Sequence, residues 1–272
     1  MVSVNTNCGA MVALQNLNST QSELSTVQDR LNTGLKVASA RDNGAVFAIA
    51  QDMRVRVSAQ GILREAMDRV SATIDNALSA AGGVQNILTQ MRDKALAASA
   101  SGLSAVQIAA YNNDFVALRE SIDPLVNAAQ LNGQNLINDS AASLSVKVND
   151  LSLGTVITIT GQGLTTASLS INTLTFATAG EASTAVATIA GVISSMNASL
   201  ASLGAKSKAI EQFRTFNSKL SDTLEKGIGE LVDADLPRES ANLQALQVKQ
   251  QLGAQALSIA NQSPQIILSL FR

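Results

Sequence analysis

The 272-residue sequence predicts a mainly α-helical fold: an elongated antiparallel helical bundle or coiled coil, whose terminal helices pair as a second coiled-coil layer, with a small β-hairpin insert. Two observations predict this class. Apolar residues recur with heptad spacing over segments of about 40 residues. Only 3% of the residues are aromatic and Trp is absent, so the core must consist of aliphatic side chains, which suit closely packed helices.

A first long helix is predicted between residues 58 and 100. Its apolar residues form two interleaved series with alternating steps of four and three, which is the seam of a coiled coil. At 1.5 Å per residue, a helix of about 40 residues is about 60 Å long, longer than a compact globule of this chain length is wide. The predicted core positions of this helix include Leu63, Val70, Ile74, Val84, Leu88 and Met91.

Two more helices and a β-rich insert are predicted in the middle of the chain. A second long helix from 182 to 226 carries Ile189, Met196 and Leu203 at intervals of seven, which complete the predicted core. A shorter helix runs from 104 to 128, and Pro124 is expected to kink or end it. Between them the apolar period falls to two, which predicts strands at 144–148, 156–160, 169–171 and 174–176.

Each end of the chain carries a further amphipathic helix with heptad spacing. The charged side chains of residues 1–29 are Glu23 and Asp29 alone, and those of residues 241–272 are Lys249 and Arg272 alone. A solvent-facing helix normally carries Glu and Lys on its outer face, so we predict that both ends are buried together in an assembly. The alternative is an ordinary two-helix hairpin that closes one domain. The predicted self-assembly residues are Leu17, Leu24, Leu31, Leu252, Ile259, Ile266 and Leu270.

Local signals place the joints between the ends and the middle of the chain. Gly34 is expected to end the first helix, and Ser39 with Asp42 fits the capping-box pattern at the start of the next. Asp235 can cap the last helix, which Pro264 is expected to bend or end. Two short connectors therefore join the ends to the middle at similar distances from the two termini.

Composition excludes several classes of function. His is absent and Cys8 is the single cysteine, which removes the commonest metal ligand and general base, so we expect no catalytic residue, no metal and no cofactor. The net charge of −2 gives no basic patch for nucleic acid. The first 29 residues contain no basic side chain and no apolar run reaches about 18 residues, so neither a cleaved signal peptide nor membrane insertion is expected.

The residues at both joints resemble the flagellin family. The N-terminal match comprises Val4-Asn-Thr-Asn7, Leu14-Gln-Asn-Leu17 and Leu31-Asn-Thr-Gly-Leu-Lys-Val-Ala-Ser-Ala-Arg-Asp-Asn43. The C-terminal match comprises Val232-Asp-Ala-Asp-Leu-Pro-Arg-Glu-Ser240, Gln250-Gln-Leu-Gly253, Pro264 and Leu268-Ser-Leu-Phe-Arg272. Two terminal signatures in the right order make the resemblance specific, and the short insert is similar to that of alpha-proteobacterial flagellins.

The resemblance implies a structural subunit, not an enzyme, that polymerises into the flagellar filament used for swimming. It implies a terminal coiled-coil core that forms an inner tube (1–33 plus 236–272), a helical rod domain (34–140 plus 180–235) and a β-rich insert (141–179). It also implies export to the cell exterior by the flagellar type III apparatus without a cleaved signal peptide. The implied partners are further copies and other flagellins, hook-associated proteins and an export chaperone.

Two other structural roles remain open at this point. A hook-filament junction protein has the same terminal signatures and would adapt one polymer to another. A secretion-system needle or translocator protein is a weaker alternative, because a β-rich insert and paired terminal signatures are unexpected there.

Overall fold

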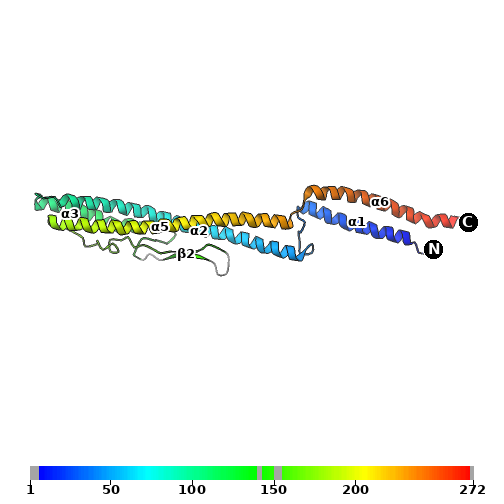
Figure 1. Cartoon of the computed structure of the whole chain (residues 1–272), viewed down its shortest axis with the longest axis horizontal. Coiled ribbons are helices and arrows are strands. Elements are labelled where there is room, and N and C mark those ends of the chain that lie inside the picture. Colours follow the sequence, from blue (N-terminus) through cyan, green and yellow to red (C-terminus); the bar gives the residue numbers. More distant parts are fainter. Residues whose placement is uncertain (1–5, 140–142, 150–154, 270–272) are drawn as a thin grey trace. The chain divides into compact units, whose positions relative to one another are not determined.

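The computed structural model describes residues 6–139, 143–149 and 155–269, with the side chains of 263–269 left undescribed (Figure 1). Long helices with a small antiparallel sheet confirm the predicted fold class. The elements in chain order are α1 (Cys8–Thr33), α2 (Gly44–Ala98), α3 (Ala105–Glu120), α4 (Ile122–Ala128), β1 (Leu144–Lys147), β2 (Val156–Ile159), α5 (Ala179–Val232) and α6 (Leu236–Ser269).

The chain divides into two compact units. Unit 1 comprises Met1–Arg56 and Asp222–Arg272, and unit 2 comprises Val57–Ser221. Helices α2 and α5 contribute residues to both units. The predicted domains, with boundaries at 33 and 236, describe an inner tube and an outer rod in an assembly of many copies. That division stays a prediction.

Unit 2 is built around the antiparallel helices α2 and α5. Two cross-helix contacts fix their register: Arg214 Nε lies 2.7 Å from Asp68 Oδ1, and Gln85 Nε2 donates to Asn197 Oδ1 at 3.0 Å. One large apolar cluster fills the space between these helices, α3, α4 and the insert. Of the residues predicted for the core, Val70, Ile74, Val84, Leu88, Met91, Ile189, Met196 and Leu203 are buried in this cluster, and Leu63 packs against it half-buried.

The predicted helix from 104 to 128 is two helices. Ser104 caps α3 with a full capping box, in which its hydroxyl accepts from Gln107 N and the Gln107 side chain accepts from Ser104 N. Helix α3 ends at Glu120 and α4 begins at Ile122, so the break precedes Pro124, which lies in the first turn of α4. A proline is tolerated in a first turn because those backbone N–H groups have no partner within the helix.

Two of the four predicted strands are absent from the insert as the structure describes it. Strands β1 and β2 form an antiparallel pair in which Leu144 lies opposite Ile159. The predicted strand at 169–171 is the end of a turn, in which the carbonyl groups of Thr165 and Thr166 accept from Leu169 N and Ile171 N, and 174–176 is irregular. Alternating apolar residues predicted strands there, but Ile171 and Phe176 reach the core from a chain that keeps turning.

In unit 1 a short connector joins α1 to α2. Gly34 ends α1 in the left-handed conformation (φ 72°), as predicted from its position, and its N–H donates to Arg30 O. Lys36 N and Val37 N donate to Val232 O, and Ala234 N donates to Gly34 O. The segment that follows α1 and the segment that precedes α6 are therefore hydrogen-bonded to each other. Val37, Ala50 and Val232 form a small buried apolar cluster next to them.

Helix α5 contains an unusually apolar stretch. One of its 18-residue windows has a mean hydropathy of 1.5, and by length and composition this is the single helix in the described part of the chain that could cross a membrane. No such segment was expected from the sequence. The same helix contributes Ile189, Met196 and Ile210 to the core of unit 2.

Candidate functional site

Helices α1 and α6 lie side by side and antiparallel within unit 1 (Figure 1). Three contacts along the pair define its register. Asn7 Nδ2 donates to Ala260 O at 2.8 Å, and Gln250 Nε2 donates to Gln21 Oε1 at 2.6 Å. Near the connector, Arg30 NH1 lies 3.3 Å from Glu239 Oε1. Asn7 also caps α1, because its side chain accepts from Ala10 N.

The seam of α1 in this pair is the predicted one. Leu24 and Val27 are buried, and the predicted assembly residues Leu17 and Leu31 are half-buried. Leu17 lies beside Gly253 of α6, where an added Cβ would stand 3.3 Å from its methyl group. The α1 residues therefore serve first to hold α6 within the same chain.

The seam that α6 turns toward α1 is different from the predicted one. Steps of four and three place Glu239, Leu243, Leu246, Gln250, Gly253, Leu257 and Ala260 on its inner face, and each of them is buried or half-buried. Sequence reasoning missed this seam because polar and small residues interrupt it. A more hydrophobic series on the same helix, Leu252 and Ile259, gave the stronger signal, although Gly253 is what permits close approach to α1.

The predicted series of α6 faces away from α1. Leu252 is 58% exposed and Ile259 is 69% exposed, and Val248 on the same side is also exposed. The backbone at Ile266 continues α6 through Pro264, while its side chain and all of Leu270 lie outside the described residues. The described part of this helix thus presents a second apolar seam that none of the other described residues covers.

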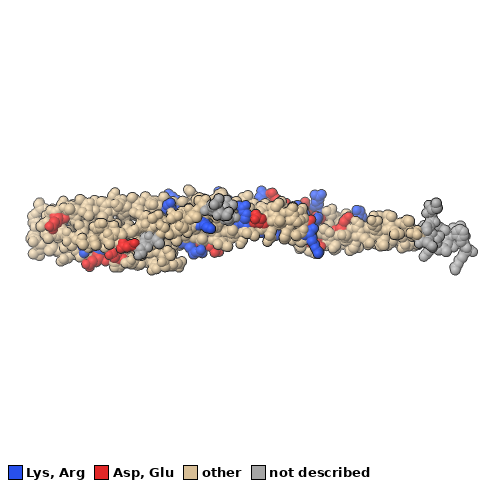
Figure 2. All heavy atoms as spheres, turned by 90° about the horizontal axis from the view of Figure 1, so that it is seen from below, with Lys and Arg blue, Asp and Glu red and all other residues tan. Residues whose placement is uncertain are grey.

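Charged side chains of the pair are confined to one end. In α1 they are Glu23, Asp29 and Arg30, and in α6 they are Arg238, Glu239 and Lys249. The opposite ends of both helices are uncharged over residues 8–22 and 250–262. On the face drawn in Figure 2, the blue and red atoms of the pair accordingly lie near the connector.

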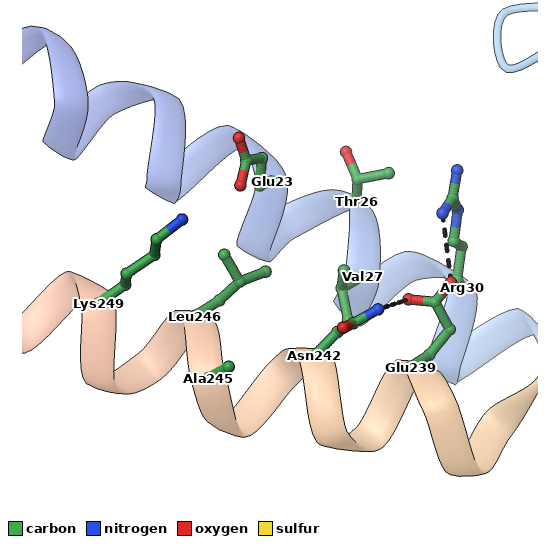
Figure 3. Close-up of a pocket in the computed structure, with 9 residues that line it drawn as sticks. All are labelled: Glu23, Thr26, Val27, Arg30, Glu239, Asn242, Ala245, Leu246 and Lys249. Carbon is green, nitrogen blue, oxygen red and sulfur yellow. Dashed lines mark hydrogen bonds and ion pairs between the residues drawn. The ribbon is translucent and has the colours of Figure 1, made fainter.

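A pocket of about 470 Å³ opens between the helices at this charged end (Figure 3). Side chains from both helices line it: Glu23, Thr26, Val27, Arg30, Glu239, Asn242, Ala245, Leu246 and Lys249. Lys249 extends from α6 toward α1, and Glu23 stands on the facing side of α1 (Figure 3). Sequence reasoning noted the scarcity of charge in this region but missed that four of the six charged residues of the two helices line one pocket.

The predicted capping residues occupy the connectors. Asp235 caps α6 as its Oδ1 accepts from Arg238 N at 3.2 Å. Ser39 and Asp42 do not start α2, which begins at Gly44 after Asn43, whose Oδ1 accepts from Val46 N. Asp42 instead closes a turn by accepting from the backbone N–H groups of Ser39 and Ala38, and the bond from Ser39 N is the main cause that lowers its pKa.

The described residues contain no group of three or more Cys, Asp or Glu that could hold a metal ion. Cys8 is exposed on the first turn of α1. The features that remain are an antiparallel helix pair, an uncovered apolar seam and a stretch without charge. Such features are typical of a structural subunit that associates with copies of itself.

Comparison with known proteins identifies the family. Residues 4–142 match the bacterial flagellin N-terminal helical region, and residues 186–271 match the bacterial flagellin C-terminal helical region. The chain belongs to the bacterial flagellin family, and its function is that of a structural subunit of the flagellar filament. The relatives are structural proteins, and nothing in the comparisons supports the alternative of a hook-filament junction protein.

Relatives match over the whole chain. Flagellin FljK of Caulobacter vibrioides is 46% identical, with 99% of this chain and 98% of that protein covered. A flagellin of Brucella melitensis is 34% identical over the full length of both chains. The crystal structure of Bacillus cereus flagellin has the same fold over 56% of this chain and 88% of its own, with a TM-score of 0.51 and 20% identity.

Proposed function

We propose that the chain polymerises through the α1–α6 pair, in which α1 holds α6 in place and the outer seam of α6 contacts a second copy. Leu17, Leu24 and Leu31 act within the pair, whereas Leu252 and Ile259, followed by Ile266 and Leu270, make the contact between copies. One observation carries this proposal. Leu252 and Ile259 are largely exposed at heptad spacing on a helix whose other seam is already covered.

The small core of the pair supports a coupling between folding and assembly. Three buried apolar residues join α1 to α6, namely Leu24, Val27 and Leu246. Ordering a residue costs about 1–2 kcal/mol of backbone entropy, which so few contacts do not offset over two helices. A second copy on the outer seam supplies the missing burial, and a non-closing contact of this kind generates an open helical polymer. Unit 2, with its own core, forms the outer wall.

The family also suggests the route and the partners of the subunit. In this proposal the chain leaves the cell unfolded through the flagellar type III apparatus, without a cleaved signal peptide, and acts in the extracellular filament. An export chaperone binds it beforehand, and hook-associated proteins border the polymer. The proposal gives the chain a structural role and no catalytic one, in keeping with its structural relatives.

Single charge insertions test the proposed seam. Leu252→Asp and Ile259→Asp each place an unpaired carboxylate where the second copy covers the helix, so we expect polymerisation to be lost. Sedimentation and electron microscopy measure the polymer, and circular dichroism checks that unit 2 stays helical. Gln251→Glu adds a charge beside the seam and is expected to polymerise far more readily than Leu252→Asp. Normal filaments from Leu252→Asp would refute the proposal.

A further inference from the structure

We propose that the outer seam of α6 packs against an apolar stripe on α1 of the next copy, formed by Cys8, Met11 and Leu14, and not against another α6 seam. This inference rests on the proposed function, because it names the surface of the second copy that covers Leu252 and Ile259. Each copy then carries both halves of the contact, one on each helix of the pair.

The stripe lies on the side of α1 that is turned away from α6. Cys8, Met11 and Leu14 follow each other in steps of three, which places them on one face of a helix. Met11 is 64% exposed, Leu14 is 48% exposed, and Cys8 is exposed as well. None of them belongs to the inner seam of α1, in which Leu24 and Val27 are buried. Each helix of the pair therefore has one covered seam and one exposed apolar face.

A filament cannot grow through a contact between two α6 seams alone. Two identical surfaces that pack on each other are related by a twofold axis, and such a contact closes at a dimer. The chain is a filament subunit, so it must present two different surfaces that remain available in turn as copies are added. The outer seam of α6 therefore needs a different surface as its partner.

Charge disfavours the other exposed apolar residues of unit 1 as that partner. Asp52 lies between Ile49 and Val55 in α2, and Asp235 directly precedes Leu236. A contact that buries these apolar side chains also removes water from the carboxylates beside them, which is costly unless each carboxylate is paired. Apart from the α6 seam itself, the exposed large apolar side chains in the described part of unit 1 are Met11, Val12, Leu14, Ile49, Val55 and Leu236.

The stripe of α1 matches the seam of α6 in its lack of charge. Helix α1 is uncharged over residues 8–22, and α6 is uncharged over residues 250–262. Exposed amides accompany both surfaces, Gln15 and Asn18 on α1 and Gln251 on α6. A carboxamide has two donors and an acceptor, so amides of the two copies can bond to each other while the apolar groups are buried. The two surfaces can thus cover each other without burying a charge.

A crosslink between assembled copies tests the inference, and Cys8 supplies one of its two ends. Gln255 lies three residues after Leu252 and four before Ile259, so Gln255→Cys places a second thiol on the outer seam of α6. We expect a short bismaleimide to join this thiol to Cys8 of the next copy in the polymer. Denaturing electrophoresis should then show a ladder at multiples of the chain mass. The wild type, with Cys8 alone, is the control and should give the band of a single chain.

The double variant Gln255→Cys with Cys8→Ser decides between the two kinds of contact. The ladder should disappear in it, because only the seam of each copy still carries a thiol. A dimer band that persists would show that two α6 seams meet and would overturn the inference. A polymer of Gln255→Cys that gives no crosslink between copies would overturn it as well.

A charge on the stripe provides a second measurement. Met11→Asp buries an unpaired carboxylate in the contact, so we expect the critical concentration for polymerisation to rise about a hundredfold or more. Val55→Asp adds the same charge at an exposed apolar residue of unit 1 outside the contact, and should assemble like the wild type. If Met11→Asp assembles normally while Leu252→Asp does not, the stripe is wrong and the seam stands. If Leu252→Asp also assembles normally, the proposed function fails too.

Discussion

The core of unit 2 and the core of the α1–α6 pair differ greatly in size. Unit 2 buries large side chains in one continuous cluster. In it the rings of Phe115 and Phe176 pack edge to face, with their centroids 5.2 Å apart. The α1–α6 pair buries Leu24, Val27 and Leu246 and leaves Met11, Leu252 and Ile259 in solvent. One region completes its burial within the chain, whereas the other retains apolar surface for a partner. Sequence patterns of the same heptad type therefore serve two purposes in one molecule.

Deletion of residues 241–272 should have the largest effect on this contrast. It removes most of α6, including the outer seam, so we expect polymerisation to be abolished. Unit 2 keeps its whole core and should stay helical with a cooperative thermal transition. Sedimentation measures the first result and circular dichroism the second. A truncated chain that loses the helicity of unit 2 would show that the two cores are not independent.

A matched pair of leucine truncations compares the regions directly. Leu88 is fully buried in unit 2, so Leu88→Ala should lower the free energy of unfolding by about 2–5 kcal/mol. Leu252→Ala should change it by less than about 0.5 kcal/mol in the dilute chain, because this side chain is already exposed. Urea unfolding followed by circular dichroism measures both. Similar losses for the two variants would mean that α6 is covered in the isolated chain.

Gly34→Ala should produce a smaller, local effect. The residue has φ 72°, which costs a residue with a Cβ about 1–2 kcal/mol, although the added methyl group would meet no atom. Because the α1–α6 pair depends on a second copy for its burial, we expect a higher critical concentration for polymerisation, measured by sedimentation. Gly204→Ala, in the interior of α5 with open space around it, should instead be stabilising by up to about 1 kcal/mol. Equal effects of the two substitutions would contradict this account.

Acid should weaken the insert of unit 2 through Asp139. Hydrogen bonds from Ser168 and then Thr165 lower the pKa of this carboxyl below its ordinary value of 3.8. A lowered pKa in the folded state means that the stabilisation is present above pH 3.8 and is lost as the pH falls through the folded value. The free energy of unfolding should therefore fall less steeply with decreasing pH below pH 5 in Ser168→Ala than in the wild type. Urea unfolding at each pH measures it. This is the smallest of the expected effects, and an unchanged pH profile would exclude the contribution of Asp139.

The two long helices α2 and α5 and the seam of α1 followed from the sequence, whereas α3 and α4 were expected as one helix. Most core positions of α1, α2 and α5 are aliphatic residues in alternating steps of four and three, so the periodic signal and the packing agree. The seam of α6 did not follow, because two series compete on that helix. The covered one contains Gln250 and Gly253, whereas the exposed one contains Leu252 and Ile259. Periodicity locates an apolar face but does not say whether the same chain or another copy covers it.

Features that depend on local hydrogen bonds were also hard to predict. The hydroxyl groups of Thr165 and Thr166 donate to Asp139 and Asp123, and the chain turns just before the predicted strand at 169–171. Asn43 rather than Ser39 caps α2, because Asp42 draws Ser39 into a separate turn. Some of these hydrogen bonds join residues that are distant in sequence, and others depend on which of several neighbouring polar residues caps the helix. Neither kind produces a periodic pattern in the sequence.

The hydrogen bonds of the connector have a mechanical consequence. Lys36, Val37 and Ala234 tie the segment after α1 to the segment before α6, through Val232 and Gly34. Tension applied to either terminal helix is therefore shared by both covalent strands before it reaches α2 and α5. A subunit loaded through its terminal helices therefore meets two covalent segments joined by hydrogen bonds, not one segment alone.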